Sequence, residues 1–139
     1  MFKHILLPVD LSHKHGSALE MAAHMAAQNR GAVTLLHVIE VIHGMTKDEE
    51  KPFYERLERF AHRHLETLGQ HLAEGKIPWQ AVLIYGSRVQ ETIRYAQEKK
   101  VDLMIMTSPR MDPDHLRESF ASLSYPMAFV APCPVLLVR

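Results

Sequence analysis

The chain has 139 residues, the length of one domain rather than two. Hydrophobic residues make up 47% and charged residues 23% of it, which is typical of a globular protein and excludes disordered, collagenous and disulfide-scaffold classes. Its 16 basic and 16 acidic residues give a formal net charge of zero, so charge does not point to nucleic acid, an anionic membrane or an acidic partner.

The cysteine content and the lengths of the apolar segments indicate in which cellular compartment the protein works. Cys133 is the only cysteine, which excludes an internal disulfide and any site built from several cysteines. The apolar segment 5–9 is too short for the core of a signal peptide. The weakly polar segment 126–138 is interrupted by prolines and falls short of the ~20 residues that a membrane-spanning helix needs. We therefore expect a soluble, cytoplasmic protein with no membrane partner.

Five apolar runs rich in Val, Ile and Leu are the predicted strands. They cover Ile5–Val9, Val33–Ile39, Ala81–Tyr85, Leu103–Met106 and Val135–Val138. Each run is almost continuously apolar, as in strands that are covered on both faces of a parallel sheet. Helices should therefore lie between them.

The first two predicted helices lie on either side of the second run. Ser17 and Glu20 have the spacing of a capping box at the start of the first helix, and Gly31 follows its end. The second helix covers residues 52–74, where apolar residues form one stripe. The polar segment 44–51 before it is interpreted as a solvated surface loop.

Two further helices are predicted in the second half of the chain. Ser87 and Gln90 repeat the capping-box spacing at the start of the third helix. A fourth helical pattern runs over residues 115–130, and Pro126 inside it should kink or shorten the helix.

Strands alternating with helices predict an α/β fold, with one domain over residues 1–139 and an open parallel five-stranded sheet covered by helices on both faces. Ligands bind to such sheets outside the carboxyl ends of the strands. Neither G-x-G-x-x-G nor G-x-x-x-x-G-K-[ST] follows the first run, which argues against a dinucleotide-binding domain and a P-loop enzyme.

The segment after the first run offers candidate metal ligands. Asp10, His13 and His15 carry carboxylate and imidazole groups, which suit divalent transition metals. The chain contains 10 histidines, however, so neighbouring histidines arise by chance, and no fourth ligand is evident. We predict no metal site, and a metal-binding protein that uses this loop is a distant alternative.

No arrangement for nucleophilic catalysis is indicated by the sequence. Neither a Ser–His–Asp nor a Cys–His combination can be argued, and Cys133, between two prolines, is interpreted as a packed thiol. His62, His64 and His71 lie on the predicted second helix and are interpreted as packing residues. We therefore expect a protein that is not an enzyme.

Segments taken in chain order resemble the universal stress protein family. They are Ile5–Asp10 with Ser12, Leu35–Val38, Gly86–Ser87, Val101–Met106 and Ala131–Arg139. The sequences I-L-L-P-V-D near one end and A-P-C-P-V-L-L-V-R at the other are the most specific part. The resemblance spans the whole chain and implies an adenine nucleotide alpha hydrolase-like, Rossmann-like fold with strand order 3-2-1-4-5. It also implies a cytoplasmic homodimer linked to stress survival.

Many members of this family bind ATP through a glycine motif after the fourth strand. The matching positions here are Ser108, Met111, Ala121 and Ser122, so Ser122 alone agrees with the motif and all three glycines are replaced. Prolines in the segment 108–115 remove backbone N–H donors, and its aspartates repel phosphate. The sequence therefore predicts that ATP is not bound.

The resemblance also implies a degenerate nucleotide pocket. Asp10 and Val38 match positions that lie near adenosine in ATP-binding members, and Ser108 and Ser122 match the motif itself. We expect no cofactor, and ATP or AMP are the ligands that such a pocket would take. The favoured interpretation is a dimeric binding or regulatory protein, and the alternative is an ATP-binding member switched by nucleotide.

The last run is the predicted dimer interface. In the implied strand order it is a sheet edge with unpaired backbone groups and apolar side chains, which favours pairing with a second copy. We therefore expect a homodimer formed through Val135, Leu136, Leu137 and Val138, without a nucleic acid partner.

Overall fold

The computed structural model describes residues 1–108, 113–115 and 124–139. Its strands form one parallel five-stranded sheet in the order β3-β2-β1-β4-β5. They are β1 (His4–Pro8), β2 (Ala32–Ile39), β3 (Trp79–Tyr85), β4 (Leu103–Thr107) and β5 (Val135–Val138). The predicted fold class and strand order are confirmed, and each strand lies within two residues of its expected bounds.

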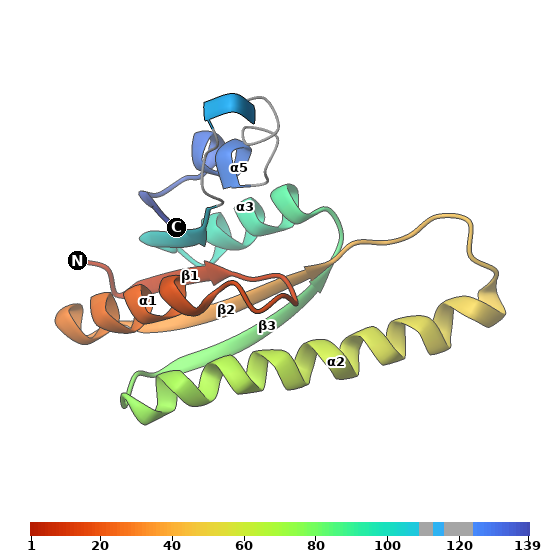
Figure 1. Cartoon of the computed structure of the whole chain (residues 1–139), viewed down its shortest axis with the longest axis horizontal. Helices are drawn as coiled ribbons and strands as arrows, with labels where there is room; N and C mark the ends of the chain where they lie inside the picture. The colour runs from red at the N-terminus through yellow and green to blue at the C-terminus, as the bar shows by residue number, and fades with distance from the viewer. Residues whose placement is uncertain (109–112, 116–123) are drawn as a thin grey trace.

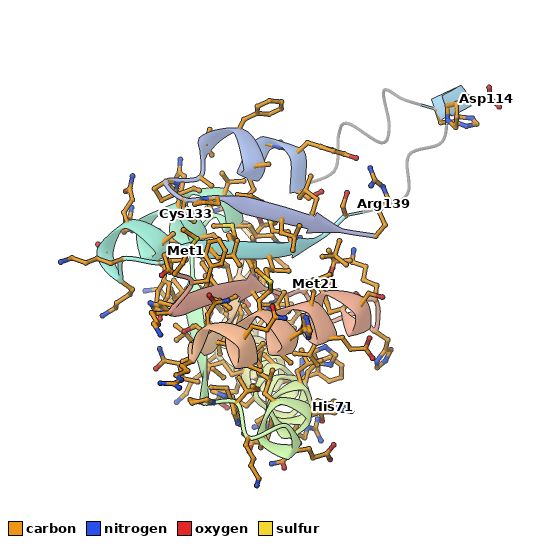
Figure 2. All side chains as sticks on the ribbon, turned by 90° about the vertical axis from the view of Figure 1, so that its left-hand side faces the viewer. Met1, Met21, His71, Asp114, Cys133 and Arg139 are labelled. Atoms are coloured by element: carbon orange, nitrogen blue, oxygen red, sulfur yellow. The ribbon has the colours of Figure 1, made fainter. Side chains whose placement is uncertain are left out.

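Helices cover both faces of this sheet (Figure 1). They are α1 (Gly16–Asn29), α2 (Lys47–Glu74), α3 (Arg88–Glu98) and α5 (Ser124–Val130). The described residues also form a short 3-10 helix, η1 (Pro113–His115), apart from the sheet (Figure 2). Apolar residues of α1 and α2 pack in one cluster on one face, and those of α3 and α5 pack in a second cluster on the other face. None of the helices in the described part of the chain is long and apolar enough to cross a membrane.

The central strand β1 is buried on both faces. Ile5, Leu6 and Leu7 are all 0% exposed, and Leu6 belongs to the cluster opposite that of its two neighbours. Burying a side chain of this size stabilises a fold by about 1.5–3 kcal/mol. The continuous apolar character of this run follows from its place between two helical layers.

A carboxylate joins the start of β1 to the approach to β4. Asp102 accepts hydrogen bonds from the backbone N–H of Lys3 at 2.8 Å and from that of His4 at 3.0 Å. The His4 ring lies 3.0 Å from the hydroxyl of Thr34 on β2. These contacts hold the beginning of β1 between its two neighbouring strands.

The predicted capping of α1 is wrong, and that of α3 is right only in position. Helix α1 begins at Gly16 with His15 as its N-cap, and its first turn has no side-chain cap. Ser17 therefore lies inside the helix, and its spacing to Glu20 has no capping role. Ser87 is the N-cap of α3, as expected, but its side chain makes no capping hydrogen bond.

Helix α2 begins earlier than the apolar stripe predicted, so most of the expected 44–51 loop is helical. Thr46 and Glu49 form a reciprocal capping box, with both hydrogen bonds at 3.3 Å. Acidic residues in the first turn favour the helix dipole. The first buried residue of α2 is Ala61, and the part before it extends beyond the sheet (Figure 1).

The expected helix over residues 115–130 is observed only as α5 within the described residues. Residues 116–123 lie outside the described part, and His115 belongs to η1 instead. Pro126 is the third residue of α5, in the first turn, where no N–H is needed for an intrahelical hydrogen bond. Helix α5 accommodates this proline at its start and leads into β5, which runs along the sheet edge from near Cys133 to Arg139 (Figure 2).

Candidate functional site

A pocket of about 340 Å³ opens at the carboxyl ends of β1 and β4. The chain turns from β1 to β2 on one side, and β4 lies on the other, so the pocket is at the point where strand order reverses. Its volume is at the lower end of the range for small-molecule pockets. The lining residues are Pro8, Val9, Asp10, Lys14, His15, Leu36, His37, Val38, Arg88, Thr92, Met106, Thr107, Ser124 and Met127.

One part of this lining is apolar and buried. Val9, Val38, Met106 and Met127 are each at most 6% exposed. The remaining lining includes an acid, two cations and several hydroxyl and imidazole groups. Such a pocket suits a flat apolar ring that carries polar substituents.

Asp10 is the charged centre of the polar part. Its carboxylate accepts hydrogen bonds from the Ser12 backbone N–H at 2.9 Å and from His15 Nε2 at 2.7 Å, and it lies 3.1 Å from the Lys14 ammonium. Partial burial raises the pKa of Asp10, but these hydrogen bonds together outweigh it and hold the pKa well below its usual range. The carboxylate is therefore ionised at neutral pH.

His15 links Asp10 to Thr107. Its Nε2 lies 2.7 Å from Asp10 Oδ1 and its Nδ1 lies 2.7 Å from Thr107 Oγ1, while the side chain is only 5% exposed. An ionised carboxylate can only accept, so Nε2 carries the proton and Nδ1 accepts from the Thr107 hydroxyl. The Asp10 amide nitrogen, 3.1 Å from Nε2, does not donate to it in this tautomer. Burial lowers the pKa of His15, against the opposing effect of Asp10, and favours the neutral ring.

His37 forms a second buried imidazole in the pocket wall. Its Nδ1–H donates to the Val9 carbonyl at 2.8 Å, which fixes the ring orientation. Burial lowers the pKa of His37, although the hydrogen bond to Val9 opposes the shift. A neutral imidazole therefore lies beside the apolar part of the pocket.

The structure brings two of the four predicted nucleotide residues together. Asp10 and Val38 both line the pocket. Ser108 is not among the lining residues; it is buried, and its backbone N–H donates to the Val138 carbonyl at 2.7 Å. Ser122, like Met111 and Ala121, lies outside the described residues.

The predicted metal alternative has no support from the geometry of its loop. Both ring nitrogens of His15 are engaged, and the ring of His13 packs edge-on against that of His64 at 5.8 Å. Within the described ranges, no group of three His, Cys, Asp or Glu side chains could hold a metal ion. Cys133 is partly buried, as expected of a packed thiol, and burial raises the pKa of its thiol.

Several lining residues were not predicted as site residues. Thr107 directly follows the fourth apolar run, Leu103–Met106, and this position was the one available signal for it. Arg88 and Thr92 belong to α3 and Ser124 begins α5, where a sequence pattern does not distinguish a pocket residue from any other helical residue.

The residues of the predicted dimer interface, β5, are all partly buried. The carbonyls of Pro134 and Val138 accept hydrogen bonds from the β4 side, from Met104 N–H at 2.9 Å and Ser108 N–H at 2.7 Å. Because backbone direction alternates along a strand, Val135 and Leu137 direct their N–H and C=O groups to the opposite edge. No strand of the described chain pairs with that edge.

Comparisons with known proteins match this chain to universal stress proteins over its whole length. The sequence profile of the universal stress protein family matches residues 1–139. The universal stress protein YxiE of Bacillus subtilis (strain 168) is 25% identical over 150 residues, covering 100% of both chains.

Solved structures share the Rossmann-like fold of this chain. The universal stress protein UspA from Lactobacillus plantarum has a TM-score of 0.80 at 23% identity, covering 99% of this chain and 98% of the other. The universal stress protein from Archaeoglobus fulgidus in complex with dAMP has a TM-score of 0.74 at 15% identity, covering 100% of both. On its sequence match over every residue, this chain belongs to the universal stress protein family.

Proposed function

We propose that this chain is a cytoplasmic, dimeric regulatory protein of the stress response, whose pocket binds an adenine nucleoside or its monophosphate and not ATP. The observation that carries the proposal is the pocket at the carboxyl ends of β1 and β4, which combines an apolar wall with one ionised carboxylate. Regulation by binding, rather than catalysis, is the function expected of such a pocket in this family.

The pocket lining matches the parts of adenosine. Val38 and Met127 offer apolar surfaces for a purine ring, and Asp10 offers a carboxylate that accepts from ribose hydroxyls. A universal stress protein of the same fold is in complex with dAMP, which supports an adenine mononucleotide as the ligand.

The charges around the pocket favour one phosphate group over three. Lys14 and Arg88 line the pocket, and both are partly offset, Lys14 by Asp10 at 3.1 Å and Arg88 by Glu40 at 3.7 Å. A triphosphate needs converging backbone N–H groups from a glycine-rich loop. The sequence of this chain replaces the glycines of that loop.

Calorimetric titration of the purified protein with AMP, adenosine and Mg-ATP tests the proposal. We expect AMP to bind at least tenfold more tightly than Mg-ATP, and Mg-ATP to bind no more tightly than about 1 mM, or roughly −4 kcal/mol. Asp10→Asn should weaken AMP binding about tenfold, which corresponds to about 1.4 kcal/mol. Glu66→Gln, on the exposed face of α2, is the matched control and should leave AMP affinity unchanged.

Two outcomes would overturn the proposal. Micromolar binding of Mg-ATP would favour the alternative of an ATP-binding member switched by nucleotide. Absence of binding by AMP and adenosine alike would show that the pocket does not take an adenine nucleoside.

A further inference from the structure

Three side chains of the pocket form a continuous hydrogen-bonded chain. Thr107 at the end of β4 contacts His15 at 2.7 Å, and His15 contacts Asp10 after β1 at 2.7 Å. All three line the same pocket, although Thr107 and His15 are 92 residues apart in sequence. The adjacency of β1 and β4 brings them together.

The direction of the hydrogen bonds gives each group a chemical role. The Asp10 carboxylate accepts from Nε2–H of His15 and fixes the ring, which leaves the Nδ1 lone pair directed at the Thr107 hydroxyl. A hydroxyl, a neutral imidazole that can take its proton and a carboxylate that orients the imidazole are the parts of an activated nucleophile. Here Nδ1 faces the hydroxyl and Nε2 faces the carboxylate.

The surroundings of His15 keep the imidazole in its basic form. The side chain is 5% exposed, and burial lowers its pKa. Within the part of the chain that the structure describes, the charged or titratable groups that act on its pKa are Asp10, Lys14 and His64. A neutral ring in contact with the Thr107 hydroxyl can accept a proton when that hydroxyl attacks an electrophile.

We propose that Thr107 is a covalent modification site, at which the hydroxyl takes up an acyl group from a reactive ester or thioester. The apolar walls of the pocket, including Met106 and Met127, suit a neutral acyl group. This site goes beyond the proposed nucleoside binding and does not depend on it.

The modification step balances without an oxidant or reductant. The Thr107 oxygen forms a bond to the carbonyl carbon, the carbonyl π pair moves to oxygen, and the hydroxyl proton passes to His15 Nδ1. The oxyanion pair then re-forms the carbonyl as the bond from carbon to the leaving oxygen or sulfur breaks, and the leaving group departs with that bonding pair. The proton on Nδ1 passes to the leaving group or, for a weakly basic one such as p-nitrophenolate, to solvent. Thr107 becomes an ester and His15 returns to its neutral form.

Reaction with p-nitrophenyl acetate tests the proposal directly. We expect a burst of p-nitrophenolate that corresponds to one acetyl group per chain, and peptide mapping by mass spectrometry should place that group on Thr107. Thr107→Val, which replaces the hydroxyl by a methyl group, should abolish the burst, and Thr107→Ser should retain it. Thr67→Val removes an exposed threonine hydroxyl on α2, outside the pocket lining, and is the matched control.

The role of His15 has a separate readout. His15→Gln should slow acetylation by at least about 100-fold, the lower range for loss of a general base. In the protein without substitutions, the acetylation rate should increase with pH as His15 loses its proton, and then level off. A merely structural His15 would change the melting temperature of the His15→Gln variant while leaving its acetylation rate unaltered.

Two results would overturn the modification site. The proposal would be overturned if, in the protein without substitutions, the acetyl group mapped to Lys14 or to another residue. This result needs no variant, so it holds even if every variant fails to fold. An unchanged burst in folded Thr107→Val would overturn the proposal as well. Neither result would bear on nucleoside binding, which the AMP titration measures without any acyl donor.

Discussion

The indole ring of Trp79 on β3 occupies the space that a side chain would need at Gly69 on α2. Glycine costs about 1 kcal/mol relative to alanine inside a helix, yet here it allows α2 to approach the sheet closely. Gly69→Ala should therefore destabilise the fold by about 1–3 kcal/mol, because overlap with the ring outweighs the gain in helix propensity. Urea unfolding measures the difference.

The control for this prediction is Gly75→Ala, since the nearest atom to a side chain there is 3.6 Å away. We expect Gly75→Ala to change the free energy of unfolding by less than about 0.5 kcal/mol. Trp79→Leu combined with Gly69→Ala should cost less than the sum of the two single changes, because the smaller side chain removes the overlap. Strict additivity would show that the ring does not restrict position 69.

The buried imidazoles predict how stability depends on pH. Burial lowers the pKa of both His15 and His37 below the ordinary value of 6.5, so the unfolded chain binds more protons just below that pH. The free energy of unfolding should therefore decrease as pH falls from 7 through 6.5, by up to about 1.4 kcal/mol per pH unit for each histidine. Asp10, whose pKa is also lowered, should add a further loss of the same sign below its ordinary value of 3.8.

Urea midpoints measured between pH 8 and pH 5 test this dependence. His37→Gln should reduce the slope, whereas substitution of the exposed His24 by Gln should leave it unchanged. A midpoint that stays constant over this range, or rises as pH falls, would contradict the prediction.

The capping box of α2 predicts a local effect of substitution. Thr46→Ala removes a cap worth about 1 kcal/mol. Because no residue of α2 before Ala61 is buried, the loss should fray the first turns and leave the sheet intact. Hydrogen exchange should become faster over residues 47–51, while the melting temperature changes little. A large fall in melting temperature would mean that these turns support the rest of the fold.

The direction of backbone groups on β5 sets the test of the proposed dimer. Leu137 directs its N–H to the open edge, so Leu137→Pro should weaken a dimer formed by strand pairing there. Leu137→Ala is the matched control, because it shortens the side chain and retains the N–H. Sedimentation should show more monomer for Leu137→Pro than for Leu137→Ala. Equal dimer fractions for the two variants would place the interface elsewhere.

The strands could be predicted from the sequence because a strand between two helical layers must be apolar along its length, as Ile5–Leu7 show. Helix ends were less predictable. The start of α2 depends on the capping box of Thr46 and Glu49, which lie outside any apolar stripe. The N-cap of α1 is His15, whose ring contacts Asp10 and Thr107 and not the first turn of the helix. Local polar contacts determined these ends, and hydrophobic periodicity does not report them.

The candidate site could be predicted only in part for a different reason. Asp10 and Val38 were found through the family resemblance, and both line the pocket. The contact between His15 and Thr107 depends on which strands are neighbours, and the residue spacing contains no information about it. In the sequence, His15 stood out with Asp10 and His13 only as a candidate ligand for the distant metal-binding alternative, whereas in the structure its Nδ1 contacts the Thr107 hydroxyl on β4.

The two hydrogen bonds that Asp102 accepts from the backbone of Lys3 and His4 can form only late during synthesis, because Asp102 emerges from the ribosome long after β1. β1, β2 and β3 are neighbours both in the chain and in the sheet, so these strands can pair before β4 leaves the ribosome. One edge of β1 then stays unpaired until residue 103 has emerged, and β1 carries three apolar residues, Ile5, Leu6 and Leu7, that are 0% exposed in the final fold. We therefore expect the nascent chain to be most prone to aggregation just before the Asp102 carboxylate reaches the first residues of the protein.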